Sequence, residues 1–98
     1  AARALAERSM KATRELDDRL SLAFQLVMCR KPTAPDLEAL RRAYERQAAF
    51  FARDLLGAKS LVSVGESKRD ETFEVGEHAA LSAVCLAILN LDEALTRE

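Results

Sequence analysis

The sequence contains few of the residues from which metal and nucleophilic sites are built. It has one histidine and two cysteines among its 98 residues. It also lacks the Cys-x-x-Cys-His segment that attaches haem covalently, the Gly-x-Ser-x-Gly elbow of many hydrolases and the Gly-x-x-x-x-Gly-Lys spacing of a phosphate loop. No catalytic constellation is therefore visible within this chain.

Neither sign of charge dominates, and long apolar runs are lacking as well. Fifteen basic residues stand against sixteen acidic ones, for a formal net charge of −1, and the two signs are interspersed. This pattern gives no electrostatic footprint for nucleic acid. Charged side chains interrupt most apolar runs before they reach the roughly 18 to 20 residues that span a bilayer, so we expect no membrane insertion.

Glycine and proline are scarce, with three and two residues, while 49% of the chain is hydrophobic and 32% is charged. This composition is typical of a globular, helix-rich protein. A chain of this length has room for one domain and buries roughly 60 to 65% of the surface of its unfolded form. Because the sequence begins in an Ala-rich helix without Met or a secretory signal, we expect residues 1–98 to be an excised part of a longer protein.

The spacing of apolar residues predicts an all-α fold, a compact bundle of four to five helices. The first helix is expected over residues 1–13 and the second from about Asp17. The second helix is apolar over much of its circumference, so we expect it to lie centrally. The last helix is expected to begin within residues 74–77. Its apolar stripe comprises His78, Leu81, Val84, Cys85, Ile88, Leu91 and Leu95, with Leu86 and Leu89 on a second flank.

Residues 30–36 form the clearest boundary between helices. Two cations are expected to end the second helix, and Pro32 prevents its continuation. Thr33 and Asp36 approximate a capping box for the third helix, which is expected to run for about five turns and to end or bend at Gly57. The apolar stripe of the third helix comprises Leu37, Leu40, Tyr44, Ala48, Phe51 and Leu55. Leu61, Val62 and Val64 are expected to form a short helical or extended segment.

Residues 65–73 are polar and without periodicity, which predicts the one substantial loop of the domain. Loops on rigid scaffolds often carry function. One hypothesis is therefore that Arg69, Asp70 and Glu71 contribute to an active site or ligand site shared with upstream domains.

The single histidine, His78, lies one turn after Glu74. A glutamate and a histidine at this spacing can share a metal, and Cys29 or Cys85 could join them if the fold brought one near. Zinc needs three or four converging ligands, which the sequence does not specify, so we favour a half-buried histidine near the helix start and assign no metal or other cofactor to this chain. The cysteines lie in apolar helical runs, where a free thiol behaves as a small hydrophobe.

Phe50 points away from the apolar stripe of the third helix, whereas Tyr44 and Phe51 lie on it. In so small a domain an aromatic residue on the stripe belongs first of all to the core. We therefore expect Phe50 to be the exposed contact with a neighbouring domain.

Three segments together resemble a known family. They are LAFQLVMCRKPT at residues 22–33, VGESKRD at residues 64–70 and LNLDEALTRE at residues 89–98. They resemble the C-terminal domain of unknown function in planctomycete surface or secreted proteins, which often also carry a planctomycete-type cytochrome c domain. Cys29 departs from the small residue usual in the family, and Leu81 departs from its common tryptophan.

The resemblance implies the last domain of an exported multidomain protein, at the cell surface or elsewhere outside the cytoplasm. Haem, where the protein has it, would lie in an upstream domain, and neighbouring domains would suggest polysaccharide or redox metabolism. The leading hypothesis is a non-catalytic helical module that packs on and stabilises the upstream domains, which are its expected partners. The rival hypothesis is the shared site at residues 65–73.

The polar residues near the chain end are not explained by burial, since acidic side chains near a helix C-terminus oppose its dipole. We expect Asn90 or Asp92 to hydrogen-bond to a loop or cap of a neighbouring helix, near Arg30 or Arg69. This predicts a structural polar network of Arg30, Asn90 and Asp92.

Overall fold

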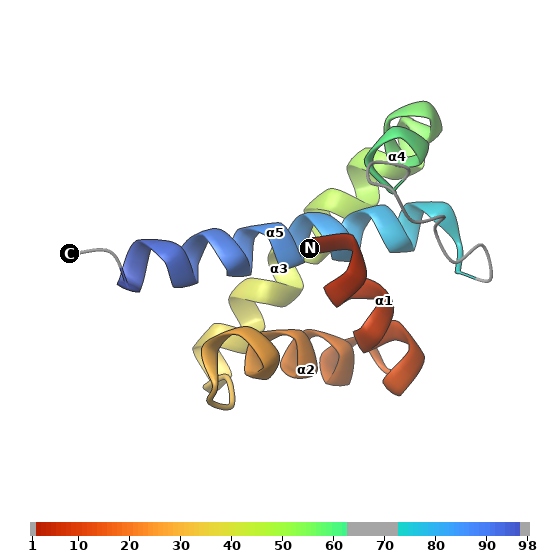
Figure 1. The fold of residues 1–98 in the computed structure, drawn as a ribbon. Coiled ribbons are helices and arrows are strands. Elements are labelled where there is room, and N and C mark those ends of the chain that lie inside the picture. Colours follow the sequence, from red (N-terminus) through yellow and green to blue (C-terminus); the bar gives the residue numbers. More distant parts are fainter. Residues whose placement is uncertain (1, 63–72, 97–98) are drawn as a thin grey trace.

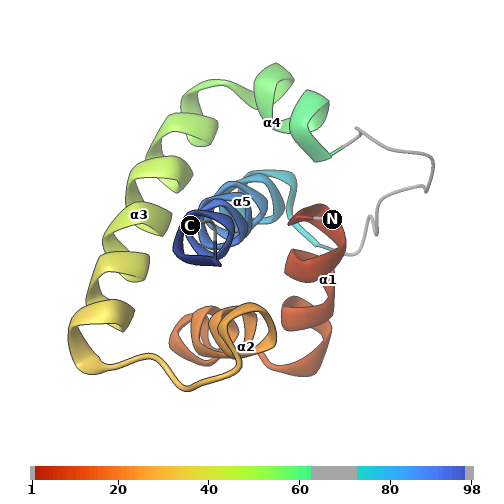
Figure 2. The same ribbon diagram turned by 60° about the vertical axis from the view of Figure 1, so that its left-hand side comes forward.

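The last helix lies at the centre of the fold. The computed structural model describes residues 2–62 and 73–96, with the side chains of the last helix described through Asp92. These ranges contain five α-helices and no strand: α1 (Ala2–Ala12), α2 (Leu16–Met28), α3 (Ala34–Arg53), α4 (Leu55–Val62) and α5 (Val75–Thr96). Helix α5 contacts all four others, which surround it in Figure 2. The predicted all-α bundle is confirmed.

The buried side of α5 explains its central position. The predicted stripe is confirmed from His78 to Ile88, all of whose members are buried. The C-terminal turns of α5 extend beyond the other helices (Figure 1), and there the prediction is wrong, because Leu91 is 47% exposed. Leu86, expected on a second apolar flank, is 48% exposed.

Helix α2 was expected to be central, and this expectation is wrong. It packs against α1, α3 and α5, but it occupies one position in the ring around α5 (Figure 2). Its 13 residues present Leu20, Ala23 and Phe24 to the core. The centre belongs to α5 because α5 has 22 residues and Glu77 is its one Asp, Glu, Lys or Arg residue before Asp92, so it can bury surface against every neighbour.

An 18-residue window of α5, Val75–Asp92, has a mean hydropathy of 1.3 and is long enough to cross a bilayer. Half of the window is buried inside the bundle. The central helix of a helical bundle needs the same composition, so hydropathy by itself does not distinguish the two settings.

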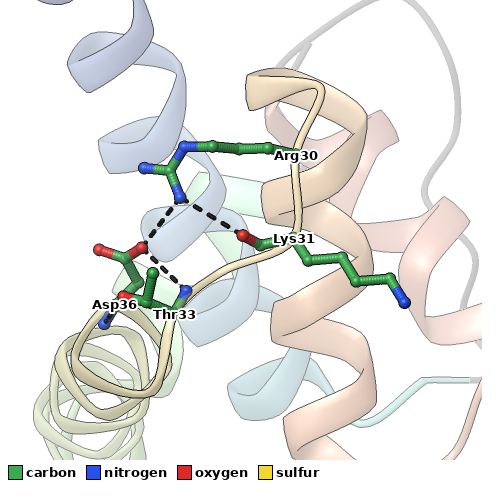
Figure 3. Close-up of polar contacts among 4 residues, drawn as sticks. All are labelled: Arg30, Lys31, Thr33 and Asp36. Carbon is green, nitrogen blue, oxygen red and sulfur yellow. Dashed lines mark hydrogen bonds and ion pairs between the residues drawn. The ribbon is translucent and has the colours of Figure 1, made fainter.

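The boundary between α2 and α3 lies close to its expected position, but α2 ends before the two cations that were expected to end it. Helix α2 ends at Met28 because Cys29 adopts a left-handed conformation, with φ 60° and ψ 24°, and its N–H donates to the carbonyl of Gln25 at 3.0 Å. The two following cations lie outside the helix. The predicted capping box is confirmed: the N–H of Thr33 donates to Asp36 Oδ2 at 3.0 Å and the N–H of Asp36 donates to Thr33 Oγ1 at 3.3 Å (Figure 3).

The third helix ends at Arg53, four residues before the expected break at Gly57. Asp54 separates α3 from α4, and its Oδ1 accepts a hydrogen bond from the N–H of Gly57 at 2.9 Å. A Cβ at position 57 would collide with this carboxylate, so a larger residue there would displace the Asp54 side chain from its present position. Leu55, placed on the α3 stripe from the sequence, instead begins α4 and is 52% exposed.

Candidate functional site

The largest exposed apolar side chains of α3 and α4 gather where the two helices meet. Phe50 in the last turn of α3 is 57% exposed, while Leu55 and Leu56 in the first turn of α4 are 52% and 80% exposed. We call these three residues the corner patch. The exposure of Phe50 agrees with the sequence analysis, whereas its contact with another domain stays a prediction. Leu55 and Leu56 were missed because their exposure depends on where α3 ends.

The geometry of α3 separates the two phenylalanines of the Phe50-Phe51 pair. Adjacent residues lie about 100° apart around a helix, so only one of them can face α5. Phe51 is buried with Ala58, Val62, Ala79 and Ala80, a cluster of mainly small side chains. The Phe50 ring meets the Phe51 ring edge to face, with centroids 5.2 Å apart and an angle of 83° between planes. Phe51 therefore orients the exposed ring.

A concavity of about 490 Å³ adjoins the corner patch. Its lining comes from Arg46, Ala49, Phe50, Arg53 and Asp54. Two apolar residues and two arginines therefore contribute to the same lining. The Asp54 carboxylate, which also lines it, is engaged by the N–H of Gly57 at the start of α4.

A second constellation is buried between α1, α4 and α5. His78 is fully buried, and its Nε2 lies 3.2 Å from Oε2 of Glu7. The same carboxylate oxygen lies 3.7 Å from Nε of Arg3, whose Nη1 donates to the carbonyl of Val62 at 3.0 Å. The rings of Phe73 and His78 form a T-shaped pair, with centroids 6.0 Å apart. This polar cluster joins the first helix to α4 and α5.

Glu74, which the sequence places one turn before His78, does not use its carboxylate on the imidazole in any contact that the described residues show. Glu74 Oε2 instead accepts a hydrogen bond from the N–H of Glu77 at 2.6 Å, as a helix N-terminus favours. The expectation of a half-buried histidine is wrong, because His78 lies beneath α1. The partner that the sequence missed, Glu7, is 71 positions away, and no local spacing could have identified it.

The described residues offer His78 neither a metal set nor a nucleophile. No three His, Cys, Asp or Glu side chains converge within residues 2–62 and 73–92. The buried hydroxyls of Ser9 and Ser82 make no hydrogen bond in this part of the chain, so neither is paired with the imidazole. Burial places the pKa of the Cys85 thiol at about 12, which keeps it protonated, and Cys29 is exposed.

Of the remaining expected site residues, the structure describes Arg30 but not the three residues of the predicted loop. Arg69, Asp70 and Glu71 lie outside the described residues, so the shared-site hypothesis stays a prediction. Arg30 donates to Asp36 Oδ2 at 3.1 Å (Figure 3), and its guanidinium also lies 4.8 Å from the centroid of the Phe24 ring.

At the other end of the expected polar network, Asn90 is exposed. Asp92 is half-buried and has an interaction partner of its own. The expected connection of these two residues to Arg30 stays a prediction. The contact of Arg30 with Asp36 accounts for the position of the Arg30 side chain without a contact to Asn90 or Asp92.

Comparisons with known proteins add no relative: no family model, curated protein or solved structure matches this chain.

Proposed function

We propose that this domain is a non-catalytic helical module that packs on the upstream domains of a larger exported protein and stabilises them. The observation that carries the proposal is the corner patch. Three large apolar side chains between positions 50 and 56, each more than half exposed, lie on either side of the junction between α3 and α4. Large exposed apolar side chains grouped at one junction of a small domain are typical of an interaction surface.

The scaffold behind the patch suits docking. Phe51 fixes the neighbouring ring from within the core, and the Asp54 cap fixes the first turn of α4. A surface held in this way loses little conformational entropy on binding, which favours affinity. The family resemblance of the three sequence segments supports the exported multidomain setting of the proposal. It also supports placing any haem in an upstream domain.

The test uses the polypeptide that carries these 98 residues in the cell, with its flanking domains. Phe50→Ser and Leu56→Ser are introduced together, and protection of the upstream domains is measured by limited proteolysis and by their melting temperature. We expect faster cleavage and a lower melting temperature, because the interface loses two apolar anchors.

Leu86→Ser with Leu91→Ser is the matched control. These leucines are 48% and 47% exposed on α5, away from the corner patch. The control should leave the upstream domains unchanged. Equal effects of both double variants, or no effect of either, would overturn the proposal, as would a natural polypeptide without upstream domains.

A further inference from the structure

Two arginines flank the corner patch without a carboxylate partner among the described residues. Arg46 and Arg53 both line the concavity and are both exposed. Other arginines of α3 are paired: Arg41 donates to Asp17 at 2.7 and 3.0 Å, and Arg42 donates to Glu38 at 2.7 Å. The free donors of α3 are thus concentrated at the patch.

Nearby carboxylates are directed elsewhere. Asp54 accepts from the N–H of Gly57, and the charge of Glu45 contributes to raising the pKa of Arg41 on the adjacent flank of the helix. Within the described chain, no carboxylate forms an ion pair with Arg46 or Arg53, although Asp54 lines the same concavity.

The order of residues along α3 defines what would complement this surface. Phe50 is four residues after Arg46 and three before Arg53, so the apolar ring lies between the two guanidiniums on neighbouring helical turns. Seven residues of α-helix span about 10 Å. A matching ligand has an apolar side chain between two carboxylates separated by that distance, which a second helix provides at i, i+7 spacing.

We propose that the corner patch binds an acidic amphipathic helix of the partner, whose two carboxylates pair with Arg46 and Arg53 while an apolar side chain packs on Phe50. This inference rests on the proposed docking function and names the chemistry of the partner. An anionic membrane fits less well, because surface attraction to lipid uses clusters of four to eight cations and the concavity suits a side chain.

The experiment titrates the isotope-labelled 98-residue chain with synthetic stapled helices that carry one leucine between two residues at i, i+7. One peptide has glutamates at these two positions, and its matched control has glutamines. NMR shifts should localise to Phe50, Leu55 and Leu56 for the glutamate peptide. The glutamine peptide should bind roughly two- to thirty-fold more weakly, the range for two exposed ion pairs, and added salt should narrow the difference.

Charge reversal supplies the second arm. Arg46→Glu with Arg53→Glu should invert the preference toward a peptide with lysines at the same positions, while circular dichroism checks that the variant remains helical. Phe50→Ser should weaken binding of both peptides to the unreversed chain.

Three results would overturn the inference. One is equal affinity for the glutamate and glutamine peptides, which would leave the docking function standing. Another is the absence of NMR shift changes at Phe50, Leu55 and Leu56 when the peptide reaches millimolar concentration. The third is arginine-dependent binding to phosphatidylglycerol vesicles, or concentration-dependent self-association through Phe50, in place of peptide binding. The proposed function fails separately, when substitutions in the corner patch leave the upstream domains unchanged.

Discussion

The left-handed residue at the end of α2 gives a direct test of how the chain leaves this helix. Cys29 has φ 60° and is the one non-glycine residue with positive φ within the described ranges. An L-residue in this conformation costs about 1 to 2 kcal/mol, because Cβ approaches the following carbonyl oxygen. Glycine avoids this cost, but its greater freedom in the unfolded chain costs roughly 0.5 to 1 kcal/mol. Cys29→Gly should therefore stabilise the domain by about 0.5 to 1 kcal/mol.

A gain of this size raises the melting temperature of a chain this long by about 2 to 8 °C. Thermal unfolding followed by circular dichroism, together with urea unfolding, measures it. Cys29→Ala is the matched control, since it removes the thiol and keeps Cβ, and it should leave stability unchanged. The Cys29 side chain is exposed, so little packing is lost in either variant. A glycine variant no more stable than the alanine variant would refute the strain argument.

Three further predictions concern the polar and ionisable groups. Glu7→Ala should cost about 1 to 3 kcal/mol in urea unfolding, because buried His78 and half-buried Arg3 lose the carboxylate that lies 3.2 and 3.7 Å from them. Glu15→Ala, at the start of α2 without a side-chain cap bond, should change stability little, and equal effects of the two variants would contradict the cluster around His78. At pH 8 a thiol reagent should modify Cys29 in the folded chain and reach Cys85 only in denaturant. The reason is that Cys85 is buried, which raises the pKa of its thiol to about 12. Rapid modification of both cysteines in the folded chain would contradict this prediction. The hydrogen bond from the N–H of Thr33 lowers the pKa of Asp36 below its ordinary value of 3.8, and Arg30 adds to this effect. The contribution of Asp36 to stability is therefore present above pH 3.8 and is lost as the pH falls through the lower pKa of the folded state. Asp36→Asn should flatten the fall in stability on acidification, and unchanged pH dependence would count against the capping box.

Local signals explain which parts of the fold could be predicted. The capping box at Thr33 and Asp36 depends on residues three positions apart, and its bonds form within one helical turn. The stripe from His78 to Ile88 follows from helical periodicity, which is also local. A prediction based on Gly57 misplaces the end of α3, because Asp54 ends this helix and caps the next one. An aspartate that caps the next helix is an equally local signal, and it was available in the sequence.

Part of the candidate site could be predicted from the sequence. Phe50 could be assigned to the surface because one of two adjacent helical residues must face outward. The corner patch could not, because it requires α3 and α4 to meet at a known residue and angle. The unpaired state of Arg46 and Arg53 also depends on where Asp17, Glu38 and Asp54 lie in three dimensions.

The sequence by itself determined the helices of this protein, because the spacing of apolar residues, the helix caps and the scarcity of glycine and proline act within a few turns. It also determined that Phe50 differs from Phe51. Only the tertiary structure decided that α5 rather than α2 occupies the centre, since central position depends on which helix buries surface against all the others. The same holds for Glu7 and His78, whose contact arises from packing across 71 positions and leaves no trace in local spacing.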